Sequence, residues 1–354
     1  MHPIFHSESK PFVIAGPCSV ESRKQLHDCV TSLETAAPVD MVRCGIWKPR
    51  TRPGGFEGLG EPALSWVDEL HERHPSLRFC CEVARPEHVE LCLNHHIDAV
   101  WIGARTSGNP FSVGELAQAL RGSSLAVMVK NPIAADVSLW QGAIERVLQA
   151  GVSDVAAIHR GFHLYHDGVP YRNKPLWEVP VELRRRMPDL PLLCDPSHMG
   201  GHRRYLEALM LTAADLGYDG YMIEVHPHPA EALTDREQQI DATGLRHLLE
   251  RLALHRQEGD ADIRLNILRQ QIDAIDERLI QAMGDRMEIS RKIAQMKQAC
   301  HMAAYQPQRW EALMRERIAA ARAAGLDAGF MRTLYETIHA ESIRIQEDIM
   351  NNKQ

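Results

Sequence analysis

FVIAG (residues 12–16) is a short apolar run that leads directly into the polar sequence PCSVES (residues 17–22). Seven more apolar runs follow before about residue 255, and they lie at 39–44, 77–83, 98–102, 125–130, 153–159, 191–195 and 220–225. Runs this apolar are typical of strands that are buried on both faces, as in parallel sheets. The sequence therefore predicts eight buried parallel strands.

Amphipathic stretches separate these runs. The clearest predicted helices lie at 61–73, 85–96, 139–150 and 202–216. Eight strand–helix units in roughly 250 residues fit an α/β fold of the (β/α)₈, or TIM, barrel class. An open doubly wound sheet is the alternative, but no G-x-G-x-x-G sequence follows the first strand.

The overall composition limits the classes of function. The chain has 354 residues and a net charge of −7 without any basic run, which argues against a nucleic-acid partner. No stretch approaches the roughly 20 apolar residues that a membrane span needs, and the N-terminus does not resemble a signal peptide. Eight cysteines without paired spacings do not indicate a disulfide framework, and Cys80 and Cys81 are expected on opposite faces of one strand. We therefore expect a cytoplasmic protein with no membrane or nucleic-acid partner.

The pattern of apolar residues changes after a polar, glycine-containing break. From residue 263 to about 299 the apolar residues recur at mostly helical spacings without proline, which predicts one helix about 55 Å long. Two shorter helices are expected near 307–323 and 327–350. The predicted organisation is a TIM barrel domain at 1–255, a linker at 256–262 and an all-α domain of three helices at 263–354.

Cationic side chains occur at or just after the ends of the predicted strands. They are Arg43, Lys48, Arg50, Arg105, Lys130 and Arg160, and Thr51 accompanies them. The C-terminal ends of all strands in such a barrel share one face, where active sites lie. Several cations on this face call for ligands with several negative charges, such as phosphates and carboxylates.

A second set of polar residues at the strand ends suits a metal ion. Cys18, His198, Glu224 and Asp235 offer one sulfur, one nitrogen and two carboxylates. This mixed set favours a divalent transition metal over Mg²⁺ or Ca²⁺, which prefer oxygen ligands. Mn²⁺ is the expected ion, with Fe²⁺, Co²⁺ and Zn²⁺ as alternatives.

Seven motifs in the first domain resemble those of 3-deoxy-D-arabino-heptulosonate 7-phosphate (DAHP) synthases. They are GPCSVES, KPRTRPGGFEGLG, GART, VMVKNP, HRGF, DPSHMGG and EVHPHPAEALTDREQQ. The similarity is to the shorter type, which shares its barrel with octulosonate 8-phosphate synthases, and it spans about residues 10–255. The resemblance implies metal ligands at Cys18, His198, Glu224 and Asp235. It also implies phosphoenolpyruvate contacts at Arg43, Lys48, Arg105, Lys130 and Arg160, and erythrose 4-phosphate contacts at Arg50 and Thr51.

The resemblance implies a condensation of phosphoenolpyruvate with erythrose 4-phosphate. The metal polarises the aldehyde oxygen as a Lewis acid, carbon 3 of phosphoenolpyruvate attacks, and water adds at carbon 2 before inorganic phosphate leaves. Arg and Lys side chains hold the carboxylate and both phosphates, and Lys48 is expected to take part in catalysis. The alternative is an octulosonate 8-phosphate synthase. The compact sequence Lys48-Pro49-Arg50-Thr51 favours the four-carbon sugar, because the relative typically has an Ala-Asn insertion before its Arg.

Three cations stand out in the predicted long helix. Arg286 and Lys297 are 11 residues apart, about three turns, so they lie on nearly the same face. Arg269 precedes Lys297 by 28 residues, or ~42 Å along the helix, so no small ligand contacts both in one chain. If both serve one site, the helix pairs antiparallel with its twin. We therefore expect a homodimer through the helical domain, within a higher homo-oligomer as an alternative.

The tail sequences RQQIDAIDERLIQAMGDRMEISRKIAQMK, YQPQR and SIRIQ resemble the all-helical chorismate mutases. The resemblance implies that the carboxylates of chorismate are bound by Arg286, Lys297, Arg309 and, from the partner chain, Arg269. It implies that Gln346 contacts the ether oxygen beside Lys297, and that Ser342 lies near a carboxylate. The rearrangement to prephenate has no covalent step, so binding one conformer and donating to the ether oxygen suffice, with Arg286, Lys297 and Gln346 as the catalytic residues.

Two positions depart from the mutase pattern. The family usually has an acidic residue where this chain has Gln306, and a Glu that contacts the ligand's hydroxyl where it has Trp310. The alternative interpretation of the tail is a module that senses a ligand or dimerises without catalysis. The predicted first strand begins near Phe12, which leaves no room for a separate N-terminal effector domain, so we also expect feedback inhibition through the tail, by prephenate or by chorismate.

Overall fold

The computed structural model describes residues 4–5, 11–49, 54–164, 170–258 and 260–351. The chain divides into two compact units, Met1–Ile267 and Leu268–Gln354. Within the described residues, no helix has the combined length and apolar character needed to cross a membrane.

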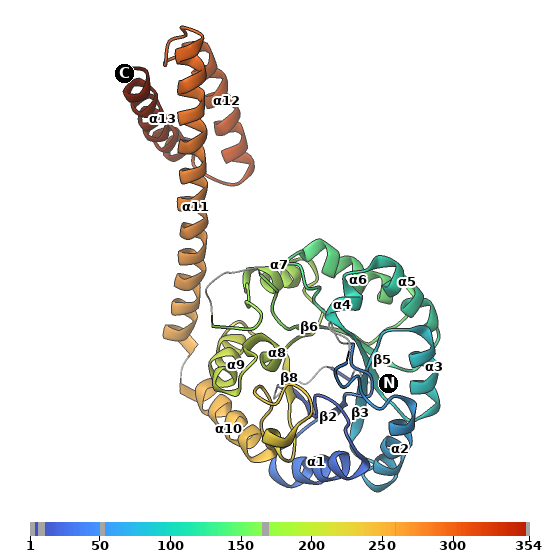
Figure 1. Ribbon diagram of the computed structural model, residues 1–354. Coiled ribbons are helices and arrows are strands. Elements are labelled where there is room, and N and C mark those ends of the chain that lie inside the picture. The colour runs from blue at the N-terminus through green and yellow to red at the C-terminus, as the bar shows by residue number, and fades with distance from the viewer. Residues whose placement is uncertain (1–3, 6–10, 50–53, 165–169, 259, 352–354) are drawn as a thin grey trace. The chain divides into compact units, whose positions relative to one another are not determined.

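The first unit is a closed barrel of eight parallel strands, as the sequence predicts (Figure 1). The strands are β1 (Phe12–Gly16), β2 (Met41–Cys44), β3 (Arg78–Val83), β4 (Ala99–Ile102), β5 (Ala126–Lys130), β6 (Val155–His159), β7 (Leu192–Cys194) and β8 (Gly220–Glu224). Each strand pairs with its neighbours in chain order, and β8 pairs with β1 to close the ring. The open doubly wound sheet is thereby excluded.

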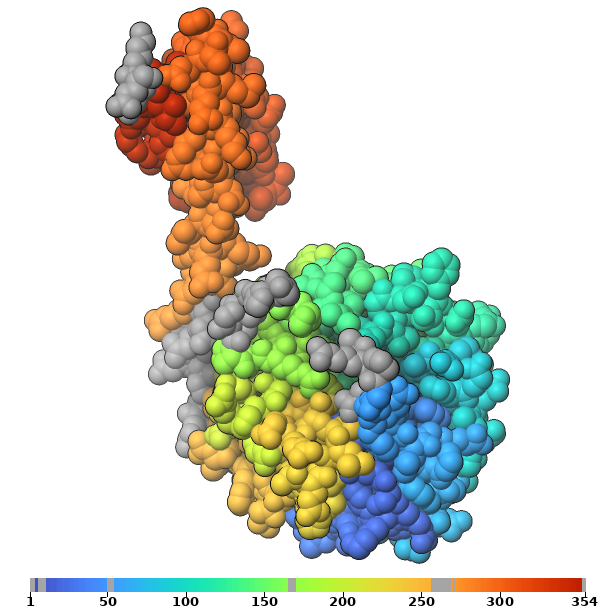
Figure 2. Space-filling model, in the orientation of Figure 1, coloured from blue at the N-terminus to red at the C-terminus, as the bar shows by residue number. Residues whose placement is uncertain are grey.

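Helices surround the barrel in chain order. They are α1 (Arg23–Ala36), α2 (Leu64–Arg73), α3 (Pro86–Asn94), α4 (Ala104–Ser107), α5 (Pro110–Ala119), α6 (Val137–Gln149), α7 (Glu178–Arg186), α8 (Pro196–Gly200), α9 (Leu206–Asp215) and α10 (Ala242–Glu258). Short 3₁₀ turns at Glu61–Ala63 and Arg203–Tyr205 precede α2 and α9. Figure 2 shows the same order on the surface, where the colour passes from blue to yellow around the barrel. The four predicted helices are all present.

Side-chain alternation along the strands separates two apolar cores. The inner core fills the barrel and includes Cys80 and Met128, whereas the outer core lies between strands and helices and includes Cys81 and Val129. The two adjacent cysteines therefore lie on opposite faces, as expected. All eight cysteines are free thiols. Because the inner positions of a strand recur every second residue, the last inner position of each strand faces the mouth of the barrel.

The three helices that the sequence predicts after the barrel are present, and all but the first turns of α11 belong to the second unit. They are α11 (Asp260–Ala299), α12 (Pro307–Ala323) and α13 (Ala328–Asn351). Helix α10 continues to Glu258 and α11 begins at Asp260, so most of the predicted linker at 256–262 has helical backbone. A polar sequence forms a helix readily when its residues have good helix propensity, as Arg, Gln and Glu do.

Gly45 lets two loops at the mouth of the barrel pack closely. A Cβ atom at this position would lie 2.0 Å from the carbonyl oxygen of Cys18, and Val20 N donates to Gly45 O at 2.9 Å. Gly45→Ala should therefore destabilise the barrel by about 1–3 kcal/mol, because the backbone must shift. Gly142→Ala in α6 is the control. No heavy atom lies within 4 Å of its added Cβ, and it should stabilise the protein by about 0.5–1 kcal/mol.

Urea unfolding followed by tryptophan fluorescence measures both effects. Equal changes in the free energy of unfolding of the two variants would contradict the role of Gly45.

Candidate active sites

The ends of the barrel strands form one polar pocket. Five cations line it, namely Arg43, Lys48, Arg105, Lys130 and Arg160. Cys18 and His198 line the same pocket. The structure thus brings together all the predicted phosphoenolpyruvate contacts and two of the predicted metal ligands. Arg50 and Thr51 lie outside the described residues.

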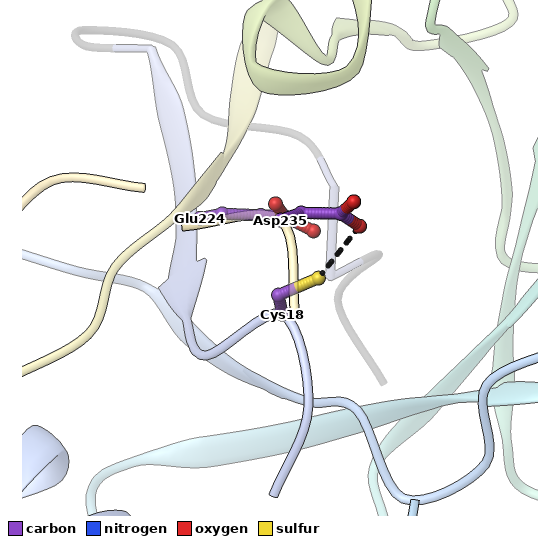
Figure 3. Close-up of side chains that lie close together, drawn as sticks. All are labelled: Cys18, Glu224 and Asp235. Carbon is purple, nitrogen blue, oxygen red and sulfur yellow. Dashed lines mark hydrogen bonds between the residues drawn. The ribbon is translucent and has the colours of Figure 1, made fainter. Parts of the chain in front are cut away.

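Three of the predicted metal ligands form a compact cluster beside this pocket (Figure 3). The donor atoms of Cys18, Glu224 and Asp235 all lie within 4.8 Å of one another. The Cys18 thiol donates to Asp235 Oδ2 at 3.2 Å. The ammonium of Lys48 contacts Cys18 Sγ and lies 2.8 Å from Asp235 Oδ2. The Cys18 sulfur and the carboxylate oxygens of Glu224 and Asp235 therefore surround a position that favours a positive charge.

His198 lies at the edge of this cluster. Its Nδ1 is 2.9 Å from Asp195 Oδ2, and its Nε2 is 3.6 Å from Glu224 Oε1. A carboxylate on one ring nitrogen fixes the orientation of a histidine whose other nitrogen binds a metal. Burial lowers the pKa of His198 to about 4 although Asp195 opposes this effect, so the imidazole is neutral near pH 7. The neutral form is the one that binds metal ions.

The carboxylates of the cluster are held in the ionised form. Burial alone would raise the pKa of Glu224, but His198, Arg43 and Lys48 lower it to about 2. Lys48 and Arg172 likewise hold the pKa of Asp235 well below its ordinary value, against the effect of burial. Ionised carboxylates in a buried site require cations nearby.

The donor set fits a divalent transition metal. Burial, together with the charge of Glu224, raises the pKa of the Cys18 thiol well above its ordinary value, whereas a bound metal deprotonates a coordinating thiol. Glu224 Oε1 is buried and accepts no hydrogen bond from the described residues, although it forms an ion pair with Arg43 at 3.2 Å. A buried carboxylate oxygen without a hydrogen bond is the feature that a metal ion would satisfy.

Several polar residues of this site were missed by the sequence analysis. Trp101 donates from Nε1 to Glu82 Oε2 at 3.0 Å, and its ring lies 5.1 Å from the guanidinium carbon of Arg43 and 5.6 Å from Lys130 Nζ. Lys130 also pairs with Asp195 at 2.7 Å. Glu82 and Trp101 occupy the last inner positions of their strands, so alternation along β3 and β4 could have revealed them.

The loop that carries Asp235 is pinned to the loop that carries Cys18. Asp235 has φ of 47°, which is unusual for a residue other than glycine. The Ser19 and Thr234 hydroxyls are 2.7 Å apart, and Gln239 joins the loops by accepting from Cys18 N at 3.1 Å and donating to Thr234 O at 2.8 Å. Such backbone conformations persist where the surrounding structure holds them, and they concentrate at functional sites.

A second polar cluster lies between α11 and α13. Arg286 Nη1 donates to Ser342 Oγ, and Lys297 Nζ donates to Gln346 Oε1 at 2.9 Å. Ser342 and Gln346 are buried on α13. The structure therefore brings together four of the six predicted mutase residues.

The other two predicted mutase residues, Arg269 on α11 and Arg309 on α12, are exposed. Arg269 and Lys297 lie on the same helix, 28 residues apart, so Arg269 cannot reach the cluster within its own chain. Gln306 and Trp310 are the two positions that depart from the mutase pattern. Gln306 is the N-cap residue of α12, but its side chain makes no capping hydrogen bond. Trp310 stacks on His339 of α13.

Comparison with known proteins assigns both units. Residues 3–258 match the DAHP synthetase I family, and residues 268–347 match chorismate mutase type II. A phospho-2-dehydro-3-deoxyheptonate aldolase of Thermotoga maritima is 30% identical over 240 residues, which are 68% of this chain and 68% of that protein. A 4-amino-4-deoxychorismate mutase of Streptomyces pristinaespiralis is 32% identical over 84 residues, which are 24% of this chain and 65% of that protein.

The crystal structure of the Thermotoga maritima DAHP synthase matches with a TM-score of 0.61 at 26% identity. It covers 70% of this chain and 69% of that one. The first family match includes more than half of the chain and the whole described barrel, and the second includes most of the helical unit. The chain therefore belongs to the DAHP synthetase I family and carries a C-terminal chorismate mutase type II domain, which makes it a bifunctional DAHP synthase and chorismate mutase of the shikimate pathway.

Proposed function

We propose that the barrel pocket condenses phosphoenolpyruvate with erythrose 4-phosphate. The observation that carries this proposal is the incomplete pairing of a buried cation that lines the pocket. Arg43 is buried, and its Nε and Nη1 have no hydrogen-bond partner among the described residues. A guanidinium with free donors beside Lys130 and Lys48 suits the carboxylate and phosphate of phosphoenolpyruvate.

The remaining cations complete this binding role. Arg105 and Arg160 contact the same substrate, and Arg50 and Thr51 contact the phosphate of the aldose. Lys130 is held by Asp195 and Lys48 by Asp235, so their ammonium groups are oriented before the substrate binds. Lys48 lies closest to the donor cluster and acts in catalysis as well as in binding. Positioning of the two substrates and stabilisation of their charges are the contributions of the protein.

Cys18, His198, Glu224 and Asp235 would hold one divalent metal ion, with Mn²⁺ as the proposed ion. Such an ion supplies Lewis-acid polarisation of the aldehyde. A 2-dehydro-3-deoxyphosphooctonate aldolase of Bartonella quintana is also similar, with 23% identity over 276 residues. The four-carbon aldose remains the proposed substrate, because the sequence from Lys48 to Thr51 lacks the insertion that is typical of octulosonate 8-phosphate synthases.

We propose that the helical unit converts chorismate to prephenate in a homodimer. Apolar side chains of α11 are 38–72% exposed, and they include Ile272, Ile275, Leu279, Ile280, Met283, Ile289, Ile293 and Met296. An apolar stripe of this length favours a second helix as its cover. A twin α11 in antiparallel orientation would bring the partner's Arg269 toward the cluster of Arg286 and Lys297, and Arg309 completes the proposed site.

The proposed division of the chain is a synthase barrel at 1–255, a connection at 256–262 and a mutase domain at 263–354, in a cytoplasmic enzyme. We also propose that prephenate, bound at the helical unit, inhibits the synthase. Ligand binding at one site changes activity at another only if it favours one of two states of the protein.

The first prediction concerns the metal. Chelator should abolish condensation of phosphoenolpyruvate with erythrose 4-phosphate by the full-length enzyme and leave the mutase rate unchanged. In a panel of aldose phosphates, the four-carbon sugar should react fastest.

Cys18→Ser should weaken Mn²⁺ binding at least about tenfold, because one ligand is replaced by a poorer one. Cys300→Ser, at an exposed position, is the control.

Release of phosphate at the parent rate after complete removal of metal would contradict this assignment.

The second prediction concerns the shared mutase site. Arg269→Ala and Lys297→Ala should each nearly silence the mutase, because each removes a charge-assisted contact. When the two inactive proteins exchange subunits, a mixed dimer has one intact site and one doubly defective site. Mutase activity should then return to about a quarter of the parent value. If mass spectrometry confirms exchange and no activity returns, the two residues do not meet across a dimer.

The third prediction concerns regulation. Prephenate should inhibit the synthase activity of the full-length parent but not that of Arg286→Ala, because Arg286 anchors the proposed effector. Arg291→Ala is the matched control, since Arg291 is exposed and its guanidinium pairs with Glu288 of the same helix at 2.9 Å. It should be inhibited like the parent. Equal inhibition of all three proteins, or of none, would refute regulation through this site.

A further inference from the structure

His339 lies on the face of α13 that carries the polar residues of the mutase cluster. It precedes Ser342 by three residues and Gln346 by seven, which are spacings of one helix face. Burial lowers the pKa of His339, and the nearby charges of Arg286 and Lys297 lower it further. Burial and the two cations thus favour the neutral form of the His339 imidazole.

Two aromatic rings fix the orientation of this imidazole. The ring of Trp310 stacks on it, with centroids 4.0 Å apart and an interplanar angle of 13°. Tyr305 approaches the same imidazole with a centroid distance of 5.9 Å. His339 Nε2 is nevertheless buried and has no hydrogen-bond partner among the described residues. A buried polar atom without a partner is unfavourable, which indicates that another group supplies the missing hydrogen bond.

The two cations of the cluster already donate hydrogen bonds to side chains of α13. Arg286 donates to Ser342, and Lys297 donates to Gln346. A ligand whose carboxylates are held by these cations would bring its ring hydroxyl into the same cluster. Related mutases are expected to contact that hydroxyl with a Glu at the position of Trp310, but an indole has a single N–H donor and no acceptor.

We propose that His339 contacts the ring hydroxyl of the mutase ligand through Nε2, and that Trp310 orients the imidazole for this contact. The inference rests on the proposed mutase function. A neutral imidazole accepts a hydrogen bond from a hydroxyl at a nitrogen without a proton. An imidazole nitrogen of His339, oriented by Trp310, thus takes the place of the Glu carboxylate that related mutases are expected to have.

The test measures how much the ring hydroxyl of a ligand contributes to its affinity for the site. Prephenate and an analogue lacking the ring hydroxyl are titrated into full-length protein by calorimetry. The parent should bind prephenate about tenfold more tightly, which corresponds to one hydrogen bond. His339→Phe keeps a ring for Trp310 but removes the nitrogen, so it should bind both compounds equally. His339→Gln retains a polar group and should keep part of the preference.

His247→Phe is the control, since His247 is exposed on α10 of the other unit, and it should behave like the parent. If His339→Phe does not fold, as judged by circular dichroism, His339→Leu makes the same comparison. A parent that prefers prephenate while the Phe or Leu variant keeps that preference would overturn the role of His339 and leave the mutase function intact. A parent that neither converts chorismate nor binds prephenate would overturn the mutase function and the role of His339 together.

Discussion

The pairing of β1 with β8 fixes the position of Cys18 relative to Glu224. In this register Gly16 lies opposite Glu224, so the loop that carries Cys18 begins beside the Glu224 carboxylate. A slip of one residue would turn Glu224 to the outer face of the barrel, because side chains alternate along a strand. Glycine is needed at position 16, since a Cβ there would lie 2.3 Å from the carbonyl oxygen of Arg43. Closure of the barrel therefore brings Cys18 and Glu224 together.

Closure also buries charged groups at the mouth of the barrel. Arg43, Lys130, Asp195 and Glu224 are at most 4% exposed. Buried charges are unfavourable unless they are paired, and the structure pairs Arg43 with Glu224 and Lys130 with Asp195. Among the described residues, Arg43 Nε and Nη1 and Glu224 Oε1 still lack a hydrogen-bond partner. The site is thus preorganised for ligands at some expense of stability, as is common where binding depends on fixed charges.

The helical unit pairs its cationic side chains in a different way. Its cations lie between helices whose apolar faces remain partly exposed, so the unit alone has a small core. Arg286 and Lys297 are paired with neutral groups of α13 instead of carboxylates. Neutral partners orient a cation without neutralising it, so the positive charge stays available for a dianionic ligand. The two units therefore hold their cations by different means, through buried ion pairs in the barrel and through neutral hydrogen-bond partners between helices.

The sequence by itself determined the eight strands, the three final helices and most of the polar residues at the strand ends. Apolar runs and their periods are local properties, and the motifs keep their residue types in order, so neither required knowledge of distant contacts. Only the tertiary structure decided that Trp101 and Glu82 complete the pocket and that Gln239 joins the Cys18 and Asp235 loops. It also decided that His339 stacks on Trp310. These contacts join residues that are far apart in the chain, and their partners depend on strand register and helix packing, which no local pattern encodes.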